Sequence, residues 1–409
     1  MTSQNSRHYA KALELIPWAT QTNAKRVQSK WGAAMPPFIK YALGCRIWDL
    51  DDREYIDFRC ALGPIILGYQ YPEVDNAVRK QLENGVVYSM ASPIELEAAE
   101  SFIRNVPWIE QIRFMKTGAD ACTACTRLAR AYTGREHILT SGYHGYHDCF
   151  ALTWPNHGAP QILNEYVHEI SYGDLEAINS VFETFGNQLA AAVVVPYEWN
   201  EDTGEEYLQL LRAKCDEYGA LLIFDEVLTG FRIARGGARE YYGITPDLAA
   251  FAKAMANGYP VSAFAGKREF MQTLEKTIIT TTYAGETLSL AATKATMEVM
   301  QADPVHEHIN KMGERLHNGF SEIIRETGAP AYAAGMPPAP YIQFDLGDSQ
   351  KNTAWQDELF SELFALGIFP SERWLINYSH KPEDIDQTLG AVRSAMLKLI
   401  EKSQVEKMA

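Results

Sequence analysis

The chain has 409 residues, and 46% of them are apolar, which is enough for a large core divided into two or three lobes. Its net charge of −15 argues against nucleic acid and anionic membrane surfaces as partners. Because it has neither an apolar leader nor an apolar run long enough to span a bilayer, we expect a cytoplasmic protein.

The first part of the chain predicts a small antiparallel unit. Within residues 36–59, strand-like residues flank an acidic pair, Asp51 and Asp52, which is typical of a turn. Further along, apolar strand-like runs alternate with helical patterns, and this alternation predicts a mainly parallel sheet with helices on both faces. We expect strands at 112–116, 137–141, 190–195, 221–224 and 261–265, and helices near 120–132, 205–218 and 268–274.

The last part of the chain is mostly helical. A long helical tract follows residue 289, is broken at Pro304 and runs to about residue 327; a strand is expected at 341–344 and a last helix from Pro382. We therefore predict an α/β fold. Its large domain would be formed by 61–300, and a smaller α+β domain would be built from both chain ends, 1–60 and 301–409.

The residues with the clearest chemistry are Asp225 and Lys253. Asp225 follows the strand predicted at 221–224, and ligands bind at the carboxyl ends of the strands in such sheets. Lys253 lies 28 positions later in a loop of small apolar residues, which would lower the pKa of its amine. A lysine that forms a Schiff base and a carboxylate that keeps a pyridine nitrogen protonated are what a pyridoxal phosphate (PLP) site needs. A loop cap and a solvated surface lysine are the ordinary alternatives.

Other residues are candidates for holding the rest of such a cofactor. Gly118 and Ala119 lie between a strand and a helix, where backbone N–H groups can bind a phosphate. Tyr143 can stack on one face of a planar ring. Val227 lies two residues after Asp225 and so on the same face of the strand. It can pack on the opposite face of the planar ring. Ordinary turns and core packing are the alternatives for all four.

Cysteine and histidine do not predict a metal site. Cys122 and Cys125 have the spacing of ligands but lack a second pair, and His144 and His147 lack a clear third ligand. Six cysteines in a chain of this length do not indicate a disulfide scaffold. We therefore expect no bound metal.

These motifs resemble those of the class III aminotransferases, PLP enzymes of fold type I, and are close to the glutamate-1-semialdehyde aminomutase branch. The densest likeness is at 218–232, which reads YGALLIFDEVLTGFR; further matches lie at 46–49, 63–68, 143–145, 245–247 and 252–253. The resemblance implies that Lys253 holds PLP and moves the substrate proton. It implies that Asp225 pairs with the pyridine nitrogen.

The same resemblance assigns the remaining contacts. Tyr143 and Val227 would sandwich the ring, and the backbone of Gly118 and Ala119 would bind the phosphate. A homodimer with shared active sites is implied, in which Thr282 reaches the phosphate across the interface.

The chain departs from the family pattern in several places. Ala119 replaces the usual hydroxyl residue of the phosphate turn, so one hydrogen bond to the phosphate should be missing. Asn200 stands where ordinary omega-aminotransferases often carry a gating glutamate, and here the aminomutases resemble this chain. The gating insert of the aminomutases is shortened to 154–160, which favours ordinary transamination, because an aminomutase must retain its diamine intermediate.

We therefore expect a PLP-dependent aminotransferase that takes an amino group from an amino acid, with glutamate as the first candidate. The acceptor would be a carbonyl compound, such as a sugar-like or aminocyclitol aldehyde or ketone. Glutamate-1-semialdehyde 2,1-aminomutase is the alternative, and a PLP-binding protein without turnover is a third. Arg26 and Arg373 are candidates for binding a substrate carboxylate, with plain surface positions as their alternative, and Asn200 is a further candidate substrate residue.

Overall fold

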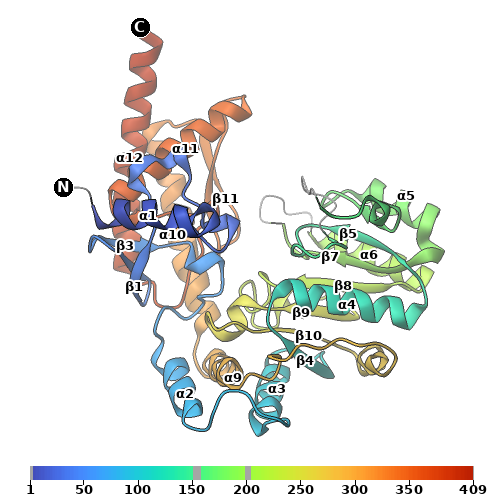
Figure 1. Cartoon of the computed structure of the whole chain (residues 1–409). Helices are drawn as coiled ribbons and strands as arrows, with labels where there is room; N and C mark the ends of the chain where they lie inside the picture. Colours follow the sequence, from blue (N-terminus) through green and yellow to red (C-terminus); the bar gives the residue numbers. More distant parts are fainter. Residues whose placement is uncertain (1–2, 151–157, 199–203, 409) are drawn as a thin grey trace. The chain divides into compact units, whose positions relative to one another are not determined.

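A computed structural model describes residues 3–150, 158–198 and 204–408 (Figure 1). Contacts divide the chain into two compact units. The sheet unit comprises residues 63–65 and 72–306, and the terminal unit comprises residues 1–62, 66–71 and 307–409. The predicted α/β architecture, with a second α+β unit built from both chain ends, is confirmed.

The sheet unit contains a seven-stranded sheet in the order β4-β10-β9-β8-β7-β5-β6. The pairs from β9 to β6 are all parallel, and β10 is antiparallel to both of its neighbours, so the expected mainly parallel sheet is found. Two short strands that the pattern did not predict, β6 and β9, complete it. The strands are β4 (Gln111–Met115), β5 (His137–Ser141), β6 (Val167–Glu169), β7 (Leu189–Val194), β8 (Leu221–Glu226), β9 (Leu248–Phe251) and β10 (Ser262–Gly266).

Helix α4 lies against the strands from β7 to β10. Its buried face is made mostly of alanine and cysteine, whose small side chains let the helix approach the sheet closely. The helix begins at a reciprocal cap between Thr117 and Asp120 and ends at Gly134, which adopts a left-handed conformation. The helices of this unit are α2 (Pro72–Leu82), α3 (Pro93–Asn105), α4 (Gly118–Thr133), α5 (Leu175–Phe185), α6 (Gly204–Tyr218), α7 (Gly237–Tyr242), α8 (Arg268–Met271) and α9 (Thr287–Ala302).

Strand β8 carries its side chains alternately to the two faces of the sheet. Leu221 and Ile223 join the core cluster beneath α4. Because side chains two residues apart point the same way, Asp225 continues this face to the carboxyl end of the strand. A carboxylate is therefore placed at the edge of the apolar layer between α4 and the sheet.

The terminal unit joins the two ends of the chain in one sheet. The antiparallel strands β1 (Ile39–Leu43), β2 (Arg46–Asp49) and β3 (Glu54–Asp57) form the predicted unit around the turn at Asp51 and Asp52, and β13 (Ile368–Phe369) pairs in parallel with β3. A separate pair is formed by β11 (Ala331–Ala334) and β12 (Tyr341–Phe344). The helices are α1 (Gln4–Leu15), α10 (Val305–Thr327), α11 (Ser349–Ala365) and α12 (Pro382–Met408), with α10 entering the unit at Glu307.

Aromatic residues from distant parts of the chain form the core of the terminal unit. The ring of Trp374 lies 5.1 Å from that of Phe58 and 5.2 Å from that of Phe320, measured between centroids. All three side chains are fully buried. Burial of each is worth about 1.5–3 kcal/mol, so these contacts hold the two chain ends together.

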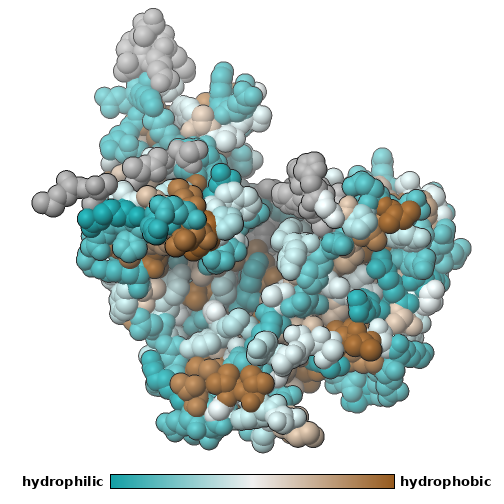
Figure 2. Space-filling model, viewed as in Figure 1, coloured by the Kyte–Doolittle hydropathy of each residue, from teal (hydrophilic) through white to brown (hydrophobic). Residues whose placement is uncertain are grey.

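The surface is largely polar, as the net charge of −15 leads one to expect. Hydrophilic and intermediate residues cover most of the face seen in Figure 2, with hydrophobic residues in separate groups between them. Across the described residues, every helix is too short or too polar to cross a membrane.

Candidate active site

A buried carboxylate, Asp225, lies at the carboxyl end of β8. Its Oδ2 accepts a hydrogen bond of 2.8 Å from Nδ1 of His144, and its Oδ1 accepts one of 2.9 Å from the backbone N–H of Val227. Because a carboxylate only accepts, Nδ1 of His144 carries the proton. The exposed fractions are 4% for Asp225 and 3% for His144, so both bonds lie away from water. The orientation of the carboxylate is therefore held from two sides.

Cys122, on the inner face of α4, is the third member of this buried group. The potential ligand atoms of Cys122, His144 and Asp225 all lie within 4.8 Å of one another. Burial, followed by the charge of Asp225, raises the pKa of the Cys122 thiol well above its ordinary value. A metal ion binds the thiolate, whereas a neutral S–H donates a hydrogen bond. The geometry therefore favours a hydrogen-bonded group around Asp225, and the expected absence of a metal stays a prediction.

Lys253 begins a short 3₁₀ helix (Lys253–Ala256) directly after β9. Its φ of 46° lies in the left-handed region, a conformation that strains a non-glycine residue by roughly 1–3 kcal/mol. Burial lowers the pKa of the Lys253 amine; the charge of Asp225 raises it, and the charge of Arg232 lowers it further. The amine therefore lies within electrostatic reach of the buried carboxylate, as the sequence pattern requires.

Two further charged residues lie beside this pair. Arg232 is fully buried, and its Nη2 donates a 2.9 Å hydrogen bond to the backbone carbonyl of Gly63. Burial raises the pKa of Glu226 to about 7. The carboxylate of Glu226 accepts bonds of 2.6 Å from the Thr229 hydroxyl and 2.7 Å from the backbone N–H of Ala238. Neither residue was predicted as part of the site, although both belong to the segment 218–232.

The first turn of α4 has the geometry of an anion site. The Asp120 backbone N–H donates to the Thr117 hydroxyl at 3.1 Å, and the Thr117 backbone N–H donates to the Asp120 carboxylate at 2.9 Å. The first N–H groups of a helix have no partner within the helix, so those of Gly118 and Ala119 remain available at its positive end. These two residues lie where a phosphate can be bound.

Two glycines allow close approach around this turn. A Cβ on Gly118 would lie 2.8 Å from both γ carbons of Val227, so the start of α4 packs directly on the end of β8. A Cβ on Gly145 would lie 2.4 Å from the Cβ of Ala119, and the φ of Gly145 is +104°. Tyr143 lies between Gly142 and His144, and this residue is 62% exposed. The structure thus brings Tyr143, Val227 and the phosphate turn to the same edge of the sheet unit.

The family model for aminotransferase class-III matches residues 27–330. The chain belongs to the class-III aminotransferases. It is 32% identical over 400 residues to 3-aminobutyryl-CoA aminotransferase of Cloacimonas acidaminovorans (strain Evry), with 95% of each chain covered. It is 34% identical over 395 residues to glutamate-1-semialdehyde 2,1-aminomutase of Syntrophobacter fumaroxidans, with 90% of this chain and 91% of the relative covered.

A solved structure of similar fold is the FumI protein of Sphingopyxis sp. MTA144 in its PLP internal aldimine form. Its TM-score is 0.92 at 26% identity, and 98% of each chain is covered. The predictions of PLP fold type I, of a transaminase and of PLP as cofactor are confirmed for this class-III aminotransferase. The described residues fit that cofactor, since a buried and oriented carboxylate, a partly buried lysine and a helix start with two available N–H groups lie in one unit.

The remaining predicted residues of this aminotransferase are placed as follows. Thr282 lies in the same unit and is exposed. Arg26 and Arg373 belong to the terminal unit; the guanidinium of Arg26 is exposed and lies 5.4 Å from the ring centroid of Trp18. Asn200 lies outside the described residues. Their roles with substrate stay predictions.

Proposed function

We propose that this class-III aminotransferase moves an amino group from an amino acid, with glutamate as the first candidate, to a sugar-like or aminocyclitol aldehyde or ketone. The observation that supports it most is that Lys253, whose pKa is lowered by burial, lies within electrostatic reach of the buried carboxylate of Asp225. When bound, PLP supplies an aldehyde that condenses with amines and a ring that takes up electrons.

Each residue has a proposed task in this reaction. Lys253 would bind the cofactor and then, as a free amine, accept a proton from the substrate carbon and return it. A lowered pKa keeps part of the lysine neutral, which this role requires. Asp225, oriented by His144, would hold the proton on the ring nitrogen. Val227 and Tyr143 would contact the two ring faces.

The part of the phosphate that faces the first turn of α4 would be bound by backbone groups. The N–H groups of Gly118 and Ala119 would donate to it, and the methyl side chain of Ala119 adds no hydroxyl donor. We propose 61–300 as the PLP-binding domain, since the residues proposed to contact the cofactor all lie within it.

A homodimer with shared sites is the proposed assembly. The turn that carries Thr282 lies against 85–95: the Thr287 backbone N–H donates to the carbonyl of Val86 at 2.9 Å. Exposed hydrophobic residues occur in both segments: Met90, within 85–95, is 83% exposed, and Ile278, four residues before Thr282, is 78% exposed. Exposed apolar groups of this kind mark surfaces that associate, so a second copy would bury them and bring Thr282 to the partner's phosphate.

The assembly can be tested by changing its apolar surface. Met90→Asp should convert the protein into a monomer in light scattering and weaken PLP binding, because the shared contact is lost. Leu397→Asp, at an exposed leucine of the terminal unit, is the matched control and should stay dimeric. A wild-type protein that is monomeric at micromolar concentration would contradict the proposal.

The alternative is glutamate-1-semialdehyde 2,1-aminomutase. The relative of 34% identity carries that name, whereas the relative of 32% identity is an aminotransferase. The shortened insert at 154–160 supports transamination, although residues 154–157 lie outside those described.

Three experiments test the proposed functions. Borohydride reduction followed by peptide mapping should place the cofactor on Lys253, and incubation with glutamate should release 2-oxoglutarate and remove the cofactor's absorbance. Glutamate 1-semialdehyde, given without a second amine, should not turn over; conversion to 5-aminolevulinate would identify an aminomutase. A protein that carries the cofactor on Lys253 but does not react with any of a broad panel of amines would instead be a non-catalytic PLP-binding protein.

A further inference from the structure

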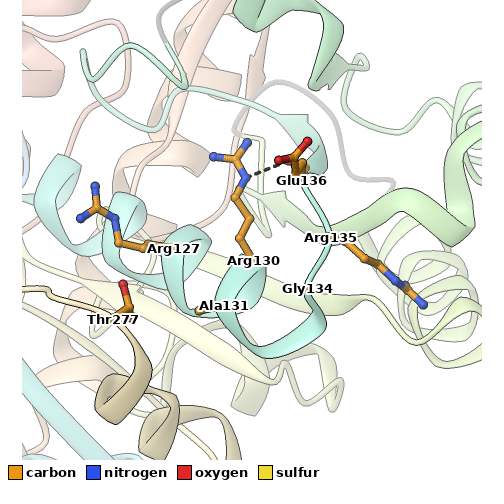
Figure 3. A pocket seen from close by; sticks show the side chains of 7 residues that line it. All are labelled: Arg127, Arg130, Ala131, Gly134, Arg135, Glu136 and Thr277. Atoms are coloured by element: carbon orange, nitrogen blue, oxygen red, sulfur yellow. Dashed lines mark hydrogen bonds between the residues drawn. The ribbon is translucent and has the colours of Figure 1, made fainter.

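A hollow lies at the opposite end of α4 from the phosphate turn. It has a volume of about 460 Å³ and is formed by the last turns of α4, the turn into β5 and Thr277 (Figure 3). We call it the arginine hollow, because its lining includes Arg127, Arg130 and Arg135. The 16 residues of α4 span about 24 Å, so this hollow is separate from the cofactor site.

The arginines of the hollow bond to backbone carbonyls rather than to carboxylates. Nη1 of Arg127 donates to Ile278 at 3.1 Å, and Nε of Arg130 donates to Glu136 at 2.8 Å, the bond drawn in Figure 3. Arg135 points away from the other two and donates to the carbonyls of Leu189 and Tyr218. Arg127 and Arg130 therefore form no ion pair with any described carboxylate.

Several donors remain for a ligand. Nη1 and Nη2 of Arg130, and Nε and Nη2 of Arg127, make no hydrogen bond to any described residue. The two residues are three positions apart and so share a face of the helix. Arg130 is only partly exposed, and burial lowers the pKa of its guanidinium. A cation that is partly removed from water and unpaired is stabilised by an oxyanion, and two guanidinium groups bind a phosphate through parallel hydrogen bonds.

The hollow also contains a carboxylate and a hydroxyl. Glu136 repels anionic groups but can accept hydrogen bonds from hydroxyls, and Thr277 can donate or accept one. The hollow is open to solvent, and its volume exceeds what a single phosphate needs. We propose that the arginine hollow binds a phosphorylated, hydroxyl-bearing small molecule, with its phosphate at Arg127 and Arg130.

A structural role for the arginines is the competing explanation. Positive side chains in the last turn of a helix interact favourably with its dipole, and Arg130 lies there. In that case, substitution would lower the melting temperature without changing the binding of any anion. The two explanations therefore differ in ligand binding, which can be measured directly.

The test is calorimetric titration of the borohydride-reduced holoenzyme, whose cofactor keeps its own phosphate turn filled. Ribose 5-phosphate should bind, inorganic phosphate should bind more weakly, and ribose should not bind. Arg130→Gln and Arg127→Gln should each weaken ribose 5-phosphate binding by about tenfold, the usual worth of a charge-assisted contact. Arg268→Gln, an exposed arginine on α8, is the matched control and should bind as the wild type does.

Each possible result either supports or contradicts the proposed site. Binding that falls with the Arg130 and Arg127 substitutions but not with the control, and that weakens as salt is raised, supports the site. No binding to the wild type at millimolar ribose 5-phosphate, or equal binding by Arg130→Gln, overturns it. Equal affinity for inorganic phosphate and ribose 5-phosphate would overturn the role assigned to the hydroxyl groups.

Discussion

His144 and Asp225 are 81 positions apart in the chain and meet through a 2.8 Å hydrogen bond in a buried setting. The imidazole donates from Nδ1, so the carboxylate keeps one orientation at the end of β8. A charge-assisted bond away from water is worth about 1.5–3 kcal/mol. His144 is therefore the residue that positions the proposed partner of the pyridine nitrogen.

Replacing His144 should expose this positioning role. His144→Leu removes the donor and should weaken PLP binding to the apoenzyme about tenfold or more, whereas His144→Asn keeps an N–H donor near the same place and should bind close to wild type. Spectrophotometric titration of the apoenzymes with PLP measures both. Equal weakening by the two substitutions would show that the ring's volume, rather than its hydrogen bond, matters.

The contact between Gly118 and Val227 predicts a paired substitution effect. Gly118→Ala places a methyl 2.8 Å from both γ carbons of Val227, and such overpacking destabilises by about 1–3 kcal/mol. Gly118→Ala with Val227→Ala should recover part of the loss. Urea unfolding of the wild type, both single variants and the double variant gives the coupling free energy. A strictly additive double variant would contradict the contact.

Glu226 predicts a pH dependence of stability. Burial raises the pKa of Glu226 in the folded state to about 7, above that of an unfolded glutamate. The stabilising contribution of the neutral side chain is therefore fully present at low pH and is lost as pH rises through 7. The difference is worth up to about 3 kcal/mol. Glu226→Gln cannot ionise and keeps an oxygen for the Ala238 N–H, so it should gain in melting temperature over the wild type between pH 5 and pH 8. A difference in melting temperature between the variant and the wild type that stays constant across this range would refute the raised pKa of Glu226.

Lys253 predicts the opposite direction of pH dependence in the apoenzyme. Burial lowers the pKa of Lys253 in the folded state, so the unfolded state binds the proton more tightly. The free energy of unfolding therefore rises as pH increases from the pKa of the folded state to the pKa of an ordinary lysine. Lys253→Met should be inactive yet more stable than the wild-type apoenzyme at pH 7. The stability difference should shrink towards pH 10, which thermal unfolding across this range can measure.

Much of the site could be predicted from local sequence. Asp225 ends an apolar run, and Lys253 lies in a loop of small residues, so strand periodicity and the chemistry of two side chains were sufficient. The central strands and the helices α4, α6, α9, α10 and α12 followed from such patterns, whereas α1, α2, α3, α5 and α11 were not predicted. The strands β6 and β9, of three and four residues, were missed because so short a run has no distinct period.

The sequence by itself determined the family and the cofactor, and it predicted the residues that would hold the cofactor, because that chemistry needs particular side chains within short motifs. Only the tertiary structure decided what surrounds them. The bond from His144 to Asp225, the thiol of Cys122 beside it and the packing of Gly118 on Val227 join segments that are distant in the chain. The alternation of apolar residues places a strand and a helix, but which side chains meet depends on how those elements pack in three dimensions.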